Sequence, residues 1–450
     1  MRITCRALVF LLLLLASMVP IESAAQDEKI SFIRDDEVES TIRRFATPLF
    51  EAAGLDASGV RIYLVNDPRL NAFVAGGQNL FINTGLILRS KSANQLMGVI
   101  AHETGHIAGG HLARTQDAMR NATAQAIIAM VVGAAAAAAS GNPNAAAAGM
   151  LGGAGLAQQS VLQYSVGQES AADQAGMRFL DRTGQSAKGL LEFFEILEGE
   201  ELLSAARQDP YLRTHPLTQQ RMDIVREHVE HSRYKSSADT PEFAELHAMM
   251  TAKLAAFINP PGQTLGQFKE SDGSVPARYA RAIAYYRIPD LAKALPLVDG
   301  LIRERPDNPW FEELKGQMLF ENGRIGEALA PYEASVRLKP SSGLLRIGLA
   351  QAMIESNDSK LTKRAIGELT EAVRSEDRNP LGWHLLAVAY GREENFGMSA
   401  LSLAEEALSG GDRKTAAQQA IRAAQLLPPG SPGRLRAEDL KATARLKDRD

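Results

Sequence analysis

Three of the chain's eight histidines stand within ten residues, in the segment HETGHIAGGH at 102–111. His102 and His106 are four apart in a stretch with helical spacing, so both imidazoles lie on one face and can bind one cation. Glu103 lies close enough to take a proton from a metal-bound water. The HExxH pattern therefore predicts a metal-dependent hydrolytic site. An ordinary amphipathic helix can match this pattern by chance. The prediction of a metal site therefore depends on finding further ligands elsewhere in the chain.

His111 is the first candidate for a third ligand. In the known arrangement with three histidines, a glycine follows the second histidine by three residues and the third histidine follows by six. Gly109 fits that arrangement, but the sixth position is Leu112. A shift of one residue in a tight turn redirects the side chain, so we expect His111 to support the site without binding the metal, or to lie on the surface.

A better third ligand lies downstream, in QESAADQAGMRFL. Glu169 and Asp173 are one helical turn apart, and the small residues between them allow this helix to approach another closely. We expect Glu169 to bind the metal and Asp173 to accept a hydrogen bond from a ligating imidazole. The alternative is an exposed acidic helix face.

The segment RTHPLTQQR contains a fourth candidate, His215. Pro216 restrains this histidine to an extended conformation on a stiff loop. His215 could stabilise the oxyanion of the tetrahedral intermediate, or it could occupy the open coordination position and keep an enzyme inactive. Arg221 could supply positive charge or brace the loop. A purely structural role for both residues is the alternative.

The start of the chain has the features of a secretory signal peptide, with cleavage predicted after Ala25. The alternative is a membrane anchor, but the apolar run from Ala7 to Val19 is shorter than the ~20 residues of a spanning helix. Cys5, the only cysteine, lies in this leader. The mature chain then has no thiol, so a metal site must use His, Asp and Glu, and we expect one Zn²⁺ per chain.

The rest of the composition indicates a chain with more than one core and no affinity for polyanions. The formal net charge is −4 and there is no basic block, which argues against a nucleic-acid partner. Strands are predicted at Arg61–Asp67 and, as a pair around Gly76 and Gly77, within Asn71–Ile87. The Pro- and Gly-rich stretch at 258–275 is predicted to link a domain at 26–257 to one at 276–450.

The C-terminal region repeats with a period of 34 residues. Ala294 and Ala328 are 34 apart, as are Pro306 and Pro340. This period, with a small residue early in the second helix and proline at its end, is typical of tetratricopeptide repeats. Such helix pairs stack into an α-solenoid whose groove binds proteins, and two further helical segments from 412 onwards are expected to cap it.

An Ala- and Gly-rich insert spans 122–157, and SGNPN interrupts it. Neither half is long enough to cross a bilayer. It is interpreted as a helical hairpin or a loop, or as a lid that makes peripheral contact with a membrane.

Taken together, NAFVAGGQNLFINTGLI, HETGH, ESAAD and THPLTQQR resemble the zinc metallopeptidase superfamily of the CAAX-prenyl endopeptidases. The resemblance implies a mostly α chain: an α+β zincin-type metallopeptidase domain with the HExxH helix and a small sheet, followed by the solenoid. It implies that His102, His106 and Glu169 bind zinc, that Glu103 is the general base and that Asp173 orients a ligand. His215 and Arg221 match the family's His-Pro loop near the metal. A substrate is expected to pair with the strand at Phe81, Ile82 and Asn83.

The resemblance also implies a place and partners, namely the Gram-negative periplasm, the β-barrel assembly machinery and misassembled outer-membrane proteins. The leading hypothesis is a periplasmic zinc endopeptidase with a chaperone-like role that degrades such proteins and assists barrel assembly. One alternative is a chaperone or scaffold whose peptidase site is largely shut. Another is a general peptide-scavenging peptidase whose repeats serve self-association.

Overall fold

The computed structural model describes residues 31–111, 114, 165–201, 211 and 215–445, and all that follows concerns the unit Phe32–Asp450. The predicted signal peptide and the insert at 122–157 lie outside the described residues. Among the described helices, none combines the length and apolar character needed to cross a membrane.

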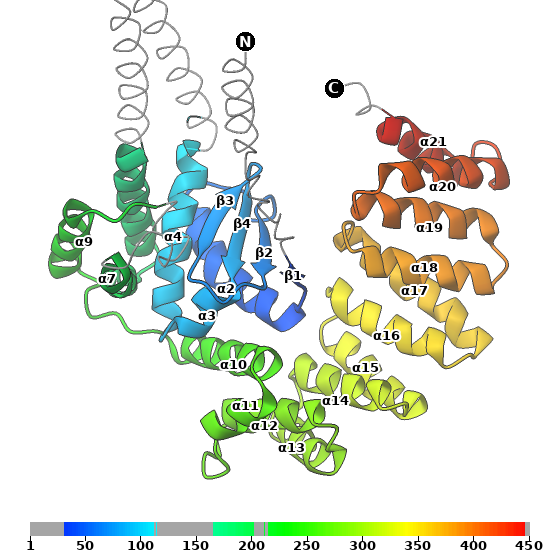
Figure 1. Cartoon of the computed structure of the whole chain (residues 1–450), viewed down its shortest axis with the longest axis horizontal. Helices are drawn as coiled ribbons and strands as arrows, with labels where there is room; N and C mark the ends of the chain where they lie inside the picture. Colours follow the sequence, from blue (N-terminus) through cyan, green and yellow to red (C-terminus); the bar gives the residue numbers. More distant parts are fainter. Residues whose placement is uncertain (1–30, 112–113, 115–164, 202–210, 212–214, 446–450) are drawn as a thin grey trace, which may run out of the picture. The chain divides into compact units, whose positions relative to one another are not determined.

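A four-stranded sheet forms one layer of the N-terminal region (Figure 1). Its strands are β1 (Phe32–Ile33), β2 (Arg61–Val65), β3 (Ala72–Ala75) and β4 (Asn79–Asn83), in the spatial order β1-β2-β4-β3. β2 and β4 are parallel, whereas β1 pairs with β2 and β3 pairs with β4 in antiparallel fashion. Gly76 and Gly77 have positive φ angles of 57° and 96° in the turn between β3 and β4, where the sequence predicts a hairpin.

Helices cover one face of the sheet, where Leu64, Leu80 and Ile82 are buried in a common core. The helices of this region are α2 (Asp36–Ala52), α3 (Thr84–Arg89), α4 (Ala93–Gly109), a helical segment at 165–182, α7 (Lys188–Glu201), α9 (Gln219–His231) and α10 (Pro241–Ile258). The second predicted strand is shorter than expected, because β4 ends at Asn83 and α3 follows at once. A short buried apolar run such as this one has no periodicity that separates strand from helix.

The C-terminal region consists of helical hairpins, as the 34-residue period predicts. The paired helices are α12 (Val275–Arg287) with α13 (Leu291–Glu304), α14 (Pro309–Glu321) with α15 (Ile325–Leu338), α16 (Gly343–Glu355) with α17 (Ser359–Ser375), α18 (Pro380–Arg392) with α19 (Phe396–Ser409), and α20 (Arg413–Leu426) with α21 (Pro432–Arg445). Within one hairpin, a Cβ added at Gly316 would lie only 2.8 Å from the ring of Tyr332, so a glycine is needed there. The fold class is confirmed: a mostly helical chain with one small sheet followed by helical repeats.

Part of the stretch at 258–275, which the sequence predicts to be a linker, is helical. Helix α11 (Pro261–Gln267) forms within it, and Thr264 is buried. The preceding helix α10 contributes Met250 and Leu254 to the core under the sheet, and Met249 and Ala252 to the first core of the repeats. Because α10 is apolar on both sides, it packs into two cores at once, and proline and glycine content alone did not reveal this.

The N-terminus of α2 carries acidic residues that contact helices of the repeat region. Asp36 accepts hydrogen bonds from Trp310 Nε1 at 2.8 Å, Lys339 Nζ at 2.7 Å and Ser342 Oγ at 2.6 Å. Asp36 is 9 % exposed, so three donors compensate a carboxylate that is nearly buried.

Lys253 of α10 is the buried cation of the same contact. Its Nζ lies 2.8 Å from Asp35 Oδ2 and 3.3 Å from Glu37 Oε2, and Glu37 also accepts a hydrogen bond of 2.8 Å from Tyr279 OH. Burial opposes the charge of Lys253, but the surrounding carboxylates raise its pKa well above the ordinary value. We call the following residues the junction cluster: Asp35, Asp36, Glu37, Lys253, Tyr279, Trp310, Lys339 and Ser342.

Candidate metal centre

Two helices position most of the side chains expected to do chemistry. Helix α4 begins at the cap Ser92, whose side chain accepts the Gln95 N–H, and ends at Gly110, whose φ of 61° is left-handed. It buries His102, Glu103 and His106. The helical segment at 165–182 lies beside it and buries Glu169 and Asp173.

The two helices touch through residues without bulky side chains. A Cβ added at Gly105 would lie 2.7 Å from the Ala172 carbonyl oxygen, and one added at Gly176 would lie 3.0 Å from the Ala101 carbonyl carbon. The small residues between Glu169 and Asp173 thus lie where the sequence suggested a close approach. Gly105, inside HETGH, is the matching residue on α4.

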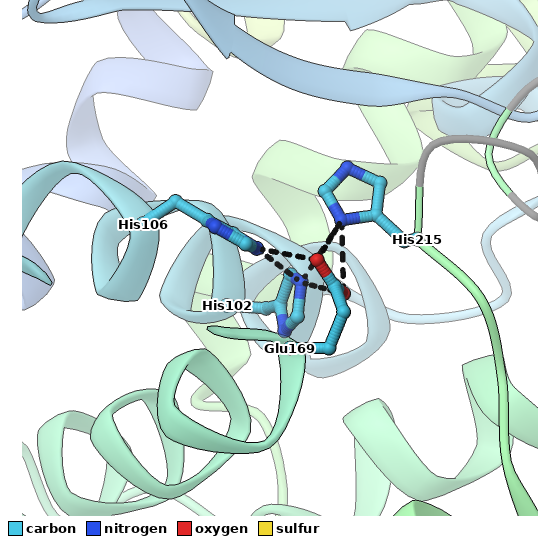
Figure 2. A group of neighbouring side chains, drawn as sticks. All are labelled: His102, His106, Glu169 and His215. Carbon is cyan, nitrogen blue, oxygen red and sulfur yellow. Dashed lines mark hydrogen bonds and ion pairs between the residues drawn. The ribbon is translucent and has the colours of Figure 1, made fainter. Parts of the chain in front are cut away.

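Four candidate ligands converge on one point (Figure 2). Ligand atoms of His102, His106, Glu169 and His215 all lie within 4.8 Å of one another, and all four residues are buried. His102 Nε2 lies 3.0 Å from His106 Nε2 and 3.3 Å from Glu169 Oε2. His215 Nδ1 lies 3.1 Å from the same carboxylate oxygen and 3.4 Å from His102 Nε2. We call these four residues the donor cluster.

These spacings fit a tetrahedral metal ion. Ligand atoms at about 2.0–2.1 Å from a tetrahedral Zn²⁺ are separated from one another by about 3.3 Å. The distances of 3.0–3.4 Å within the donor cluster match that edge. A cation at the centre would satisfy all of these lone pairs together.

The charges of the site point to a divalent ion. Glu103, Glu169 and Asp173 are three buried carboxylates, and Arg221 is the buried cation among them. When the carboxylates are ionised and the imidazoles neutral, two negative charges remain uncompensated. Buried charge of this size is costly without a counter-ion, and a dication would balance it.

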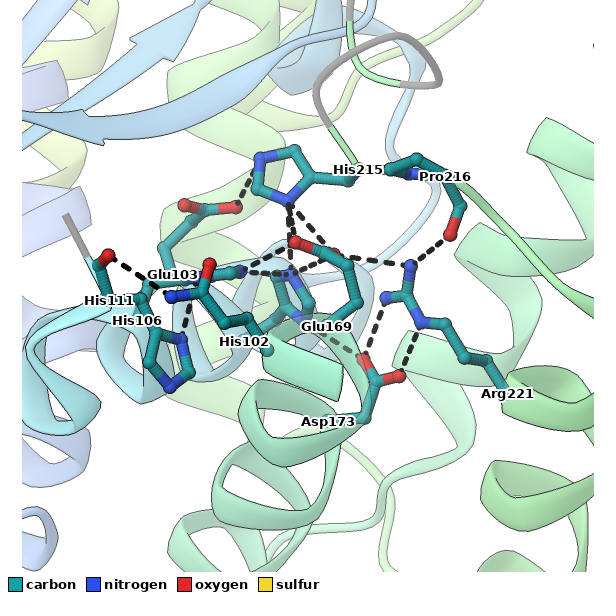
Figure 3. Close-up of polar contacts among 10 residues, drawn as sticks. His102, Glu103, His106, His111, Glu169, Asp173, His215, Pro216 and Arg221 are labelled. Carbon is teal, nitrogen blue, oxygen red and sulfur yellow. Dashed lines mark hydrogen bonds and ion pairs between the residues drawn. The ribbon is translucent and has the colours of Figure 1, made fainter. Parts of the chain in front are cut away.

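Asp173 and Arg221 contact residues of the donor cluster and of the His-Pro loop without belonging to the cluster (Figure 3). Asp173 Oδ1 lies 2.8 Å from His102 Nδ1, so His102 presents Nε2 to the other ligands. Arg221 donates from Nε to Asp173 Oδ2 at 2.6 Å and from Nη1 to the Pro216 carbonyl at 2.7 Å. Arg221 therefore links the carboxylate of Asp173 to the His-Pro loop.

The electrostatics of the imidazoles follow from these neighbours. Burial opposes protonation of His102, but Asp173 and Glu169 outweigh it and raise the pKa of His102 to about 10. Burial lowers the pKa of His106 to about 3. Burial also opposes ionisation of Glu169, but hydrogen bonds from the imidazoles hold its pKa below the ordinary value. The carboxylates therefore favour positive charge at His102, whereas burial disfavours it at His106.

Glu103 differs from the other carboxylates of the site. Among the residues that the structure describes, neither of its oxygens has a hydrogen-bond partner, although the side chain is buried. His215 Nε2 lies 3.6 Å from Glu103 Oε1. Burial raises the pKa of Glu103, which suits a group that takes up and releases a proton.

His111 lies next to the donor cluster but outside it. Its Nδ1 is 3.0 Å from His106 Nδ1, on the side of that ring away from the other ligands. Its position corresponds to a supporting contact with His106, one of the two placements that the sequence allowed.

Tyr211 is a neighbour of the site that sequence reasoning missed. Its ring stacks on that of His215 at 4.5 Å with an interplanar angle of 26°, and its carbonyl accepts the His215 N–H at 2.7 Å. Tyr211 is fully buried. The available signal was an aromatic residue four positions before the histidine.

Comparison with known families agrees with this chemistry. Residues 33–229 match the model of peptidase family M48. That segment contains the HExxH helix, the helix with Glu169 and the His-Pro loop. We call this segment, residues 33–229, the M48 domain after the family model that it matches.

Curated relatives extend beyond the M48 domain. The chain is 25% identical over 331 residues to the beta-barrel assembly-enhancing protease of Yersinia pestis, covering 73% of this chain and 67% of the relative. It is 26% identical over 380 residues to a putative beta-barrel assembly-enhancing protease of Vibrio cholerae, covering 82% and 76%. The chain is also similar to metalloprotease LoiP of Escherichia coli, at 28% identity over 192 residues, covering 40% of this chain and 68% of the relative.

Solved structures resemble part of the chain. The structure of YrrB, described as a TPR protein with an unusual peptide-binding site, is 15% identical with a TM-score of 0.32 and covers 40% of this chain and 91% of its own. The structure of MamA is 16% identical with a TM-score of 0.28 and covers 36% and 91%.

The topology of the M48 domain corrects one expectation about the substrate. Phe81, Ile82 and Asn83 lie in β4, which is paired with β2 on one side and β3 on the other. Main-chain groups of β4 are therefore already used in the sheet, so a substrate cannot add to it as a strand. Among the described strands, β3 is the neighbour of β4 whose outer edge has no pairing partner, and β3 also packs beside α4 (Figure 1). Sequence alone did not reveal the order of the strands.

Proposed function

We propose that the chain is a zinc-dependent endopeptidase of the Gram-negative periplasm that degrades misassembled outer-membrane proteins and assists β-barrel assembly. One observation carries the proposal: four ligand atoms converge within 4.8 Å beside a buried carboxylate that has no hydrogen-bond partner among the described residues. The names of the curated relatives support a protease that acts in β-barrel assembly. The helical repeats supply a surface for protein partners such as the assembly machinery.

In this proposal, His102, His106 and Glu169 hold one zinc ion. Zinc, when bound, supplies the polarisation that makes water a nucleophile at neutral pH. Glu103 takes the proton of the attacking water and delivers it to the leaving amine, which requires a carboxylate not engaged elsewhere. Asp173 and Arg221 position His102 and the His-Pro loop and do not touch the substrate.

We place the substrate along the outer edge of β3 (Ala72–Ala75). The main chain of an extended peptide can add to this edge and be held with little regard to most side chains. Such binding suits unfolded or misassembled proteins, which expose unpaired strands. β3 packs beside α4, which carries Glu103.

A second function, a scaffold with a largely closed peptidase site, is favoured by His215. Its Nδ1 belongs to the donor cluster, and its Nε2 faces Glu103. In this arrangement His215 would help to hold the ion together with His102, His106 and Glu169 and would exclude water from it. The proposal therefore includes a resting state in which His215 must leave before cleavage begins.

Glu103→Gln tests the proposal with the least change of shape. The substitution removes the proton acceptor but keeps the side-chain volume, so we expect cleavage of an unfolded protein to fall by about 10²–10⁴-fold with zinc content unchanged. His215→Ala is the companion variant, and we expect it to raise cleavage. Cleavage by Glu103→Gln at the wild-type rate would exclude the peptidase mechanism.

Complementation of a deletion strain separates the two functions. Restoration of outer-membrane protein assembly by Glu103→Gln, together with loss of cleavage, would favour the scaffold. Failure to restore it would favour the endopeptidase. Removal of residues 276–450 addresses the peptide-scavenging alternative, which predicts that both cleavage and the physiological role survive.

A further inference from the structure

The face of the sheet that is turned away from the core carries a row of aromatic rings, one from each strand. Phe32 comes from β1, Tyr63 from β2, Phe81 from β4 and Phe73 from β3. Phe32 is 49 % exposed, and the other three rings are half-buried. None of the four belongs to the core between the sheet and the helices, as far as the described residues extend. We call these four residues the aromatic row.

The rings of the aromatic row stack at the spacing of the strands. Tyr63 and Phe81 are directly opposite each other, with ring centroids 4.9 Å apart and planes at 14°. Phe81 and Phe73 are also opposite, at 4.8 Å and 7°. Neighbouring strands in a sheet lie about 4.7–4.9 Å apart, so each strand added in register can extend the stack by one ring.

The row ends at Phe73, on β3, whose outer edge is not paired with any other strand that the structure describes. Asn83 N–H donates to the Asn71 carbonyl at 3.0 Å, so this pair is hydrogen-bonded. Because hydrogen-bonded pairs alternate along an antiparallel ladder, the Phe73–Phe81 pair is also bonded, and the main-chain groups of Ala72 and Val74 point outward.

This register decides which substrate side chain meets Phe73. An antiparallel peptide bound to Ala72 and Val74 places its intervening residue opposite Phe73 in a non-hydrogen-bonded pair. Side chains are closest in such pairs, and this one projects on the same face as Phe73. The substrate side chains on either side of it project towards the face covered by α4.

We propose that Phe73 is a specificity-determining residue that selects an aromatic side chain at the substrate position paired with it. The inference rests on the proposed function, because it requires a peptide bound along β3. The selected ring stacks on Phe73 and becomes the fifth member of the aromatic row. The class of substrate is thus an extended, unfolded segment with an aromatic residue at a fixed distance from the scissile bond.

Matched peptides test this preference on the zinc-loaded mature protein. The peptides differ only by Phe or Ala at one position, and that position is moved along the sequence. We expect kcat/KM to be about 3- to 10-fold higher for Phe at a single position, as a stacked cross-strand aromatic pair contributes that much. Mapping the cleavage sites in a reduced, unfolded protein by mass spectrometry should show aromatic enrichment at the same position, without any variant.

Two variants assign the preference to one ring. Phe73→Leu keeps an apolar side chain but loses the stack, so the ratio of kcat/KM for the Phe peptide to that for the Ala peptide should fall to about 1. Phe73→Tyr should retain it. Phe32→Leu is the matched control, because Phe32 belongs to the same row at the opposite edge of the sheet, and it should keep the preference.

The outcomes separate the two proposals. If neither the wild type nor His215→Ala cleaves any peptide, or if Glu103→Gln cleaves as well as the wild type, the proposed function fails. If the wild type cleaves without an aromatic preference, or if Phe73→Leu keeps the preference, this inference alone is overturned.

Discussion

The junction cluster and the donor cluster both bury several ionisable groups, and they differ in how those groups are compensated. In the junction cluster, each carboxylate meets a donor: Asp36 has three, and Glu37 is shared by Tyr279 and Lys253. In the donor cluster, two Nε2 atoms lie 3.0 Å apart and share one carboxylate. The first is complete with protein atoms alone, whereas the second has donor atoms that a cation would complete.

This difference shows which structural features distinguish a candidate catalytic site from a structural cluster. Burial and altered pKa values occur in both clusters, so neither identifies a catalytic site by itself. Lone pairs that converge on one point, next to a carboxylate without a donor among the described residues, occur at the metal centre. Lys253 and its carboxylates are therefore assigned to holding α2 and α10 against the repeat helices.

Removal of metal should have the largest effect and should act at the donor cluster only. After dialysis against a chelator, we expect loss of one zinc ion per chain and of all measurable peptide cleavage, with recovery on adding zinc. The melting temperature should fall, since a ligand at a thousand times its Kd stabilises by about 4 kcal/mol. Elemental analysis, cleavage assays and calorimetry measure these changes. Full activity in the metal-free protein would contradict the inference that the donor cluster requires a cation.

Lys253→Met should have the next largest effect, and it should act on stability. The substitution leaves Asp35 and Glu37 without their buried cation, and removal of one partner from a buried pair costs about 3–5 kcal/mol. Urea unfolding measures the loss. Lys293→Met is the control, because its ion pair with Asp290 is exposed and is worth at most about 1 kcal/mol. Zinc content should remain that of the wild type.

The smallest predicted effect is the contribution of the buried His247 to stability as the pH changes. His247 is 7 % exposed, its Nε2 lies 2.8 Å from Ser90 Oγ, and burial lowers its pKa to about 4. Between pH 4 and the unfolded value of about 6.5, the unfolded chain binds the proton more readily, so stability falls as the pH falls. At pH 5 the loss should be about 2 kcal/mol relative to pH 7.5.

His247→Gln isolates this contribution from the titration of the metal ligands. The variant cannot take up the proton, so its stability should decrease less than that of the wild type between pH 7.5 and pH 5. Chemical unfolding at the two pH values gives the difference. An equal decrease in both proteins would mean that His247 does not titrate on unfolding.

Local patterns predicted much of the fold and of the site. The HExxH helix follows from apolar spacing and its caps, the hairpin from Gly76 and Gly77, and the repeats from their period. Glu169 could be proposed as a partner of the histidines because the small residues beside it allow two helices to meet. Each of these signals lies within one element or between two adjacent ones.

Features that depend on long-range packing could not be predicted. Strand order decides that β3, and not the strand of Phe81, has a free edge, and order is absent from local periodicity. The position of His215 depends on its contacts with Tyr211 and Glu169. The cation at the junction, Lys253, lies in α10, and its partners Asp35 and Glu37 are more than 200 positions away in the sequence.

The contact between Gly105 and Ala172 has a consequence for how a metal ion enters. Main-chain atoms bring the two helices together, so the separation between their ligands is set by the backbone and does not depend on an ion. An ion bound there would therefore enter a site that is already formed, and little of its binding free energy would be used to order the chain. This is the opposite of a zinc finger, in which the metal must first fold the peptide.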